Sequence, residues 1–87
     1  MKPNARTNNL SIKHNAPELY IRDLTSHKEI YLNPTSAYVW QKCDGNKNAS
    51  EIAKEMEREL GMIISEKVVS LALNRLADEN LLELELA

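Results

Sequence analysis

The sequence contains no phenylalanine, and its aromatic residues are Trp40 and three tyrosines. A core built from this composition must be largely aliphatic. The 87 residues are enough for one domain, and a domain of this size buries roughly 60 to 65% of the surface of its unfolded chain. The single cysteine, Cys43, excludes a disulfide within the chain and argues against a cysteine-based metal site.

Long apolar segments are also missing. No apolar run approaches the ~20 residues that a membrane-spanning helix needs. The first nine residues, M-K-P-N-A-R-T-N-N, lack the apolar segment of a signal peptide. We therefore expect a cytoplasmic protein with no membrane partner, in which residues 1–9 form a flexible tail and residues 10–87 a single domain.

Three short segments alternate between apolar and polar residues and are predicted to be strands: residues 10–13, 19–24 and 29–32. The segments Asn15-Ala16-Pro17 and Thr25-Ser26-His27 lie between them and are typical of turns. Such short links favour an antiparallel meander. In the third segment, Ile30 and Leu32 should face the core and Tyr31 the solvent.

The stretch from Tyr31 to Gly45 marks the change from strands to helices. Asn33 can cap a helix, and Pro34 suits the first helical position because its missing N–H would be unpaired there. The helix should run from Pro34 to about Lys42 and end at Asp44-Gly45. Trp40 lies on its apolar face and should anchor the core.

Two further helices are predicted. Asn48 and Glu51 have the spacing of a capping box at the start of a helix that ends at Gly61. Ser65 can cap the other helix, which should run to about Asn80. The alternating residues 81–86 fit either a last strand or an extension of this helix.

The last of these helices carries two adjacent stripes. The first has the spacing of a core face and consists of Val69, Ala72, Leu73 and Leu76. The second consists of Val68, Leu71 and Arg75. This second stripe either covers more of the core or lines a groove for a partner, and the spacing allows both.

No set of residues suggests catalysis or a cofactor. His14 and His27 lie in turn-like segments without metal-ligand spacing. Cys43 lies beside Asp44, whose charge does not favour a thiolate. The two glycines, Gly45 and Gly61, do not form a phosphate-binding loop. We therefore expect a protein that is not an enzyme and that holds no metal or cofactor.

The motifs as a set match a known pattern. Three short strands precede L-N-P-T-S-A-Y-V-W at 32–40, C-D-G at 43–45 and S-E-I-A at 50–53, with apolar residues following at 69, 73, 76, 81 and 82. Over residues 10–82 this arrangement resembles the PqqD-like family of leader-peptide recognition domains. Two positions differ from the family pattern: Thr-Ser-His forms the second turn where the family often has glycine, and Asn80 stands where glycine usually precedes the final leucines.

The resemblance implies an α+β, winged-helix-like fold, with a three-stranded antiparallel sheet followed by three helices. Members of the family are peptide chaperones. They bind the leader of a ribosomally made precursor peptide as a strand added to the third strand, and they present it to a modifying enzyme, often a radical S-adenosylmethionine enzyme, as in the biosynthesis of PQQ or related natural products. Carried onto this chain, the peptide-binding residues are Lys28, Glu29, Ile30, Tyr31 and Leu32 on the strand and Val68, Leu71, Ala72 and Arg75 on the last helix.

Two other functions are compatible with three helices and a sheet. A winged-helix protein could bind DNA, but phosphate binding needs clustered basic side chains. Residues 65–80 instead carry two basic and three acidic side chains, and residues 34–87 six basic and ten acidic ones. We therefore expect no nucleic-acid partner. A structural adaptor that binds a folded enzyme and no peptide is the other alternative.

Overall fold

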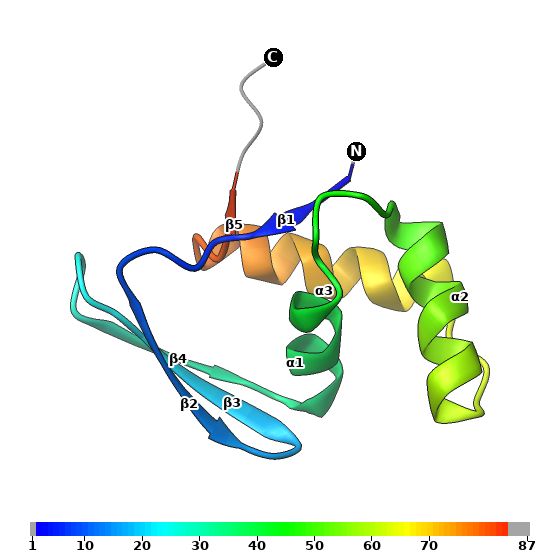
Figure 1. Cartoon of the computed structure of the whole chain (residues 1–87), viewed down its shortest axis with the longest axis horizontal. Coiled ribbons are helices and arrows are strands. Elements are labelled where there is room, and N and C mark those ends of the chain that lie inside the picture. Colours follow the sequence, from blue (N-terminus) through cyan, green and yellow to red (C-terminus); the bar gives the residue numbers. More distant parts are fainter. Residues whose placement is uncertain (1, 84–87) are drawn as a thin grey trace.

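The computed structural model describes residues 2–83, in which five strands and three helices follow one another (Figure 1). In chain order they are β1 (Asn4–Ala5), β2 (Leu10–Asn15), β3 (Glu18–Asp23), β4 (Lys28–Leu32), α1 (Pro34–Gln41), α2 (Ala49–Leu60), α3 (Glu66–Asp78) and β5 (Leu82–Glu83). The expected order of a sheet followed by three helices is confirmed.

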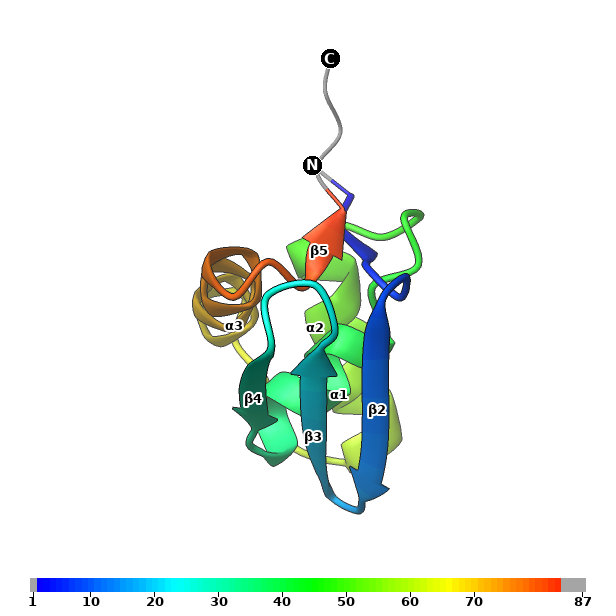
Figure 2. The same ribbon diagram turned by 90° about the vertical axis from the view of Figure 1, so that its left-hand side faces the viewer.

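Strands β2, β3 and β4 form an antiparallel sheet in this order. The alternation of side chains places Ile21, Ile30 and Leu32 in the core, whereas Tyr20 and Tyr31 lie on the opposite face with their ring centroids 5.1 Å apart. Helix α1 lies against the buried face, α3 packs on α1 and α2, and β4 forms the edge of the sheet on the side of α3 (Figure 2). The meander predicted from the alternation is therefore confirmed.

Each helix begins at the residue that the sequence predicts as its cap. The Asn33 side chain accepts a hydrogen bond from the Ser36 N–H at 2.8 Å. Asn48 and Glu51 form a complete capping box. The Ser65 hydroxyl accepts from the Val68 N–H at 3.2 Å. Because a cap satisfies N–H groups that have no partner within the helix, these short contacts fix where each helix starts.

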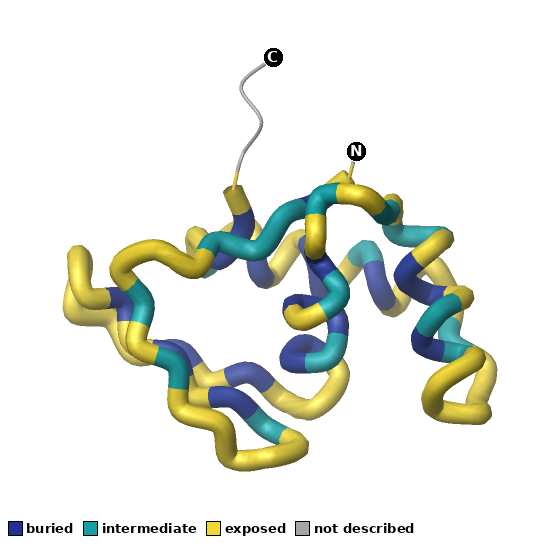
Figure 3. Tube along the Cα trace, in the orientation of Figure 1, coloured by how far each residue is buried: buried dark blue, intermediate teal, exposed yellow. Residues whose placement is uncertain are grey.

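The core is aliphatic apart from Trp40, and it lies between the sheet and the helices (Figure 3). Trp40 is 5% exposed, which confirms it as a core residue. Cys43 is also buried, and its thiol donates to the Val39 carbonyl. Burial, followed by the charge of Asp44, raises the pKa of Cys43 to about 11, so this thiol stays protonated near neutral pH.

The segment of residues 1–9, which the sequence predicts to be a flexible tail, contains a short strand and several long-range contacts. Asn4–Ala5 forms β1, which pairs with β5 and brings Asn4 opposite Glu83. The Ala5 N–H donates to the Cys43 carbonyl at 2.8 Å. The Arg6 guanidinium pairs with the largely buried Asp23 carboxylate at 3.0 Å. Tertiary partners far along the chain therefore order a polar segment that has no pattern of its own.

The two positions that depart from the family pattern share one backbone property. His27 and Asn80 both have a φ of 59°, in the left-handed region that glycine adopts most easily. At Asn80 this conformation ends α3, and the Leu81 N–H then donates to the Leu76 carbonyl at 2.9 Å. The chain continues into β5. Of the two structures that the sequence allows for residues 81–86, the strand is therefore the one observed at Leu82–Glu83. Residues 84–86 lie outside the described residues.

Candidate functional site

Strand β4 has one edge that pairs with β3 and one that no strand of residues 2–83 covers. The Tyr31 carbonyl accepts a hydrogen bond from Arg75 on α3 and therefore points away from β3. In a strand, the N–H and C=O of one residue point to the same edge, and alternate residues share that edge. Tyr31 and Glu29 thus direct their backbone groups to the uncovered edge, whereas Ile30 pairs with Ile21 of β3.

Helix α3 borders this edge with an exposed apolar surface. Val68 is 43% exposed and Leu71 is 59% exposed, whereas Val69, Leu73 and Leu76 are buried. The second stripe is therefore largely exposed and does not serve to cover the core. That it lines a groove for a partner stays a prediction. Ala72 is buried with the first stripe and contributes little surface.

The predicted site residues therefore separate into two groups. Ile30, Leu32 and Ala72 are buried, so they shape the site from behind. The others are accessible and lie along β4 or α3: Lys28, Glu29, Tyr31, Val68, Leu71 and Arg75. These accessible residues are the ones expected to line a groove, and we call the surface between them, by that prediction, the β4–α3 groove.

Two polar contacts cross the β4–α3 groove. Arg75 Nη2 lies 3.1 Å from the Tyr31 carbonyl oxygen. Lys28 Nζ lies 2.8 Å from Glu79 Oε2. Glu79 was not among the predicted site residues, because it caps the polar end of α3, outside the apolar stripe. Only its ion pair with Lys28 connects it to the groove.

The Tyr31 side chain leaves the sheet on the face opposite the core. Its hydroxyl donates to the Glu18 carboxylate, and this hydrogen bond is the main reason that the pKa of Tyr31 is raised. A neutral hydroxyl bonded to a carboxylate, with the Tyr20 ring beside it, holds the outer face of β4 in one arrangement. Neither Glu18 nor Tyr20 was expected at the site, since the sequence pattern marks only which face each one occupies.

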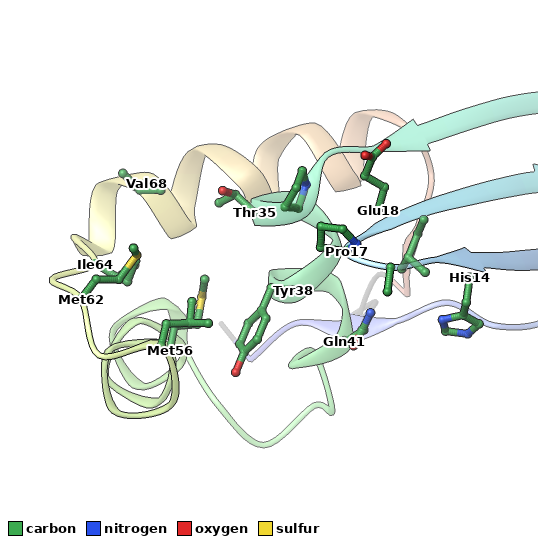
Figure 4. A pocket seen from close by; sticks show the side chains of 14 residues that line it. His14, Pro17, Glu18, Thr35, Tyr38, Gln41, Met56, Met62, Ile64 and Val68 are labelled. Carbon is green, nitrogen blue, oxygen red and sulfur yellow. The ribbon is translucent and has the colours of Figure 1, made fainter.

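A cavity of about 500 Å³ lies at the end of β4 that leads into α1 (Figure 4). Its apolar lining comes from the end of the β2–β3 hairpin, α1, α2, the α2–α3 connector and α3, and includes Pro17, Leu19, Tyr38, Met56, Leu60, Met62, Ile64 and Val68. Val68 also belongs to the β4–α3 groove. Three consecutive apolar residues between two predicted helices, Met62, Ile63 and Ile64, were a sequence signal for an apolar surface here, and two of them, Met62 and Ile64, line the cavity.

Charged residues form a network around Tyr38, one wall of this cavity. The Tyr38 hydroxyl donates to Glu59, and Lys42 bridges Glu55 at 3.0 Å and Glu59 at 2.7 Å. Hydrogen bonds to these carboxylates raise the pKa of Lys42 to about 12, with Glu59 contributing most. The network joins α1 to α2 and so holds the wall in place.

The described residues contain no cluster of three or more His, Cys, Asp or Glu side chains that could hold a metal ion. Every buried polar side-chain atom within this part of the chain has a hydrogen-bond partner. Over the same residues, no helix has both the length and the apolar character to cross a membrane. Residues 2–83 present a strand edge, an apolar helix stripe and an apolar cavity.

A three-stranded sheet packed on three helices, with the last strand of the sheet open beside the last helix, defines a winged-helix-like α+β domain. The chain belongs to the PqqD family, described as coenzyme PQQ synthesis protein D, whose sequence pattern matches residues 23–82. No curated protein matches the chain. A solved structure described as TbiB1 in complex with the TbiA(beta) leader peptide has a similar fold, with a TM-score of 0.70 and 20% identity over the whole of both chains.

Proposed function

We propose that this protein binds the leader segment of a ribosomally made precursor peptide by strand addition to β4 and presents it to a modifying enzyme. The family membership supports this role. The observation that carries it is the uncovered edge of β4 beside the exposed stripe of α3, at Val68 and Leu71. Backbone bonds to an edge supply affinity with little demand on sequence, and neighbouring apolar side chains supply selectivity. The similarly folded TbiB1 was solved with a leader peptide.

The lengths of β4 and of the exposed stripe of α3 indicate the path of a bound leader. From Arg75 to Val68, α3 spans about 10 Å, because a helix rises about 1.5 Å per residue. Beyond Tyr31, β4 continues only to Leu32 before α1 begins. A peptide that adds to β4 and continues in this direction leaves the strand, passes Leu71 and reaches Val68 at the cavity. In this proposal the cavity takes apolar side chains of the leader next to its added strand.

The protein supplies recognition and no catalysis in this proposal. The modifying enzyme, for example a radical S-adenosylmethionine enzyme, performs the chemistry, and no cofactor or nucleic acid takes part. The charge of α3 agrees with this role, because the exposed residues of the helix include the acidic side chains of Glu66 and Asp78, and the half-buried Glu79 follows directly after the helix. A peptide bound by its backbone needs no clustered basic surface.

Hydrogen exchange with and without candidate precursor leaders tests the proposal. Bound leader should slow the amides of Glu29 and Tyr31, because they gain strand partners. The amide of Ile30 serves as an internal control, since this residue already pairs with β3. Protection confined to α2 would place the binding site elsewhere and refute strand addition. Binding of the modifying enzyme with no binding of any leader would instead favour the structural adaptor.

A further inference from the structure

The edge of β4 that an added strand would use is already in contact with α3. Arg75 Nη2 donates to the Tyr31 carbonyl at 3.1 Å. An added strand would lie about 4.8 Å from β4 and would place its own N–H opposite this carbonyl. The guanidinium thus occupies the position that the incoming backbone needs.

A second contact crosses the same gap near the start of β4, where Lys28 and Glu79 form an ion pair. The Lys28 side chain is largely exposed, and exposed ion pairs contribute little to stability. The contact of Arg75 is different, because it occupies a backbone acceptor of the edge itself, the Tyr31 carbonyl. Of the two contacts, the one made by Arg75 competes directly with strand addition.

We propose that Arg75 is an internal competitor for the edge of β4: a leader strand binds by displacing the guanidinium from the Tyr31 carbonyl, and the displaced guanidinium then selects leaders with an acidic side chain that faces α3. This proposal rests on the proposed function. Arg75 is a specificity-determining residue in it, acting against neutral peptides as well as in favour of acidic ones.

The chemistry of the guanidinium explains the selection. Once displaced, Arg75 remains on α3 beside the added strand and lacks an acceptor. A carboxylate is its best replacement, because the planar guanidinium can donate two parallel hydrogen bonds to the two carboxylate oxygens. A neutral side chain offers weaker compensation. The ligand class is therefore an extended peptide with apolar side chains for Val68 and Leu71 and one Asp or Glu opposite Arg75.

Selection from a displayed library of random peptides, about twelve residues long, tests this inference without knowledge of the natural leader. Arg75→Met removes the donors and keeps an unbranched apolar side chain. Arg58→Met is the matched control, since Arg58 is an exposed arginine on α2. Peptides selected on the natural protein and on Arg58→Met should share Asp or Glu at one position. Peptides selected on Arg75→Met should lack this preference.

The competition gives a second, opposite effect on neutral peptides. A selected peptide in which Gln replaces the shared acid should bind Arg75→Met several-fold to about tenfold more tightly than it binds the natural protein, because no contact to the Tyr31 carbonyl is lost. Equal or weaker binding to Arg75→Met would refute the competition. A preference for Asp or Glu that persists on Arg75→Met would refute the selection.

Failure of the inference differs from failure of the proposed function. If peptides bind and Arg75→Met has neither effect, strand addition stands and the role of Arg75 is refuted. If no peptide binds any of the three proteins, strand addition itself is refuted, and the competition with it.

The contact between Arg75 and the Tyr31 carbonyl can also be observed directly by NMR. The amide of Leu32 shares a peptide group with the Tyr31 carbonyl, so its resonance should shift in Arg75→Met and stay unchanged in Arg58→Met. An unchanged Leu32 resonance in Arg75→Met would refute the contact.

Discussion

The indole Nε1 of Trp40 donates a hydrogen bond to the backbone carbonyl of Leu81, 2.9 Å away. These two residues are 41 positions apart in the chain. The bond connects the last turn of α1 to the residue that precedes β5, and both partners are buried. Trp40 therefore joins the helical layer to the end of the described chain, in addition to filling the core.

Truncation of Trp40 tests this double role. Trp40→Ala should lower the free energy of unfolding by roughly 3–5 kcal/mol, the usual range for a buried aromatic side chain. Trp40→Phe keeps most of the volume and loses the hydrogen bond. The buried Leu81 carbonyl still accepts from the Arg6 N–H at 2.9 Å, so this change should cost less, about 0.5–1.5 kcal/mol. Urea unfolding measures both. An unfolding midpoint for Trp40→Ala equal to that of the natural protein would show that the packing around Trp40 is wrong.

A carboxylate introduced on the exposed stripe of α3 should affect the protein differently from one introduced on the buried stripe. Leu71→Glu places a carboxylate on an exposed site, so the fold should remain and leader binding should weaken, because an apolar side chain of the leader docks there. Leu73→Glu is the matched control on the buried stripe, and it should strongly destabilise or unfold the protein. Thermal unfolding and leader titration distinguish the two. A loss of stability in Leu71→Glu as large as in Leu73→Glu would contradict the exposed stripe.

The cavity has a test of its own in two neighbouring residues. Met62 lines the cavity, whereas Ile63, which is 94% exposed, does not. Met62→Lys should weaken leader binding, because a charge replaces an apolar wall, and Ile63→Lys should leave it unchanged. Both changes fall on exposed side chains and should keep the unfolding temperature close to its natural value. Equal weakening by both would indicate a contact with the connector as a whole.

The ion pair of Arg6 with Asp23 should make stability depend on acid. The Arg6 guanidinium, and then the Thr25 N–H, lower the pKa of Asp23 to about 2, below the value of about 3.9 of an unfolded chain. A lowered pKa contributes stability above pH ~4 that is lost as the pH falls from about 4 to 2. Asp23→Asn should therefore cost stability at pH 6 and much less at pH 2.

A double-mutant cycle separates this pair from its surroundings. Arg6→Met should reproduce most of the loss at pH 6, and adding it to Asp23→Asn should cause less further loss than it does alone, since both changes remove one contact. Additive losses at pH 6 would contradict the coupling of the two side chains. Urea unfolding at pH 6 and pH 2 gives all four free energies.

The thiol of Cys43 should be unreactive in the folded protein. Its pKa of about 11 leaves very little thiolate at pH 8, and the side chain is buried. A thiol reagent such as 5,5′-dithiobis(2-nitrobenzoic acid) should react slowly with the native protein and rapidly in concentrated urea. Fast reaction under native conditions would show that the end of α1 opens readily.

Local signals determine most of the fold, and the sequence expresses them clearly. The caps of α1, α2 and α3 depend on contacts across three residues, such as the one between Asn33 and Ser36. The strand alternation correctly assigned Ile30 to the core and Tyr31 to the outer face. These features could be predicted because each one depends on residues that are close together in the chain.

The features that could not be predicted bring together distant residues. Strand β1 has two residues and no pattern, and its partner Glu83 is 79 positions from Asn4. The cavity takes its lining from five separate segments. Spacing placed Arg75 on the exposed stripe of α3, but its bond to the Tyr31 carbonyl depends on how the helix is docked against the sheet. Long-range packing decides these contacts.

The pairing of β1 with β5 brings the two ends of the described chain together, on the side of the molecule away from the cavity (Figures 1 and 2). A flexible linker of a few residues could therefore join the segments near Asn4 and Glu83, and a cut at an exposed turn such as Thr25–Ser26 would create a circularly permuted chain. Likewise, a fusion partner joined near Asn4 or near Glu83 would start from nearly the same point and leave the cavity open. The pairing of Asn4 with Glu83 thus makes this domain suitable for covalent fusion to an enzyme.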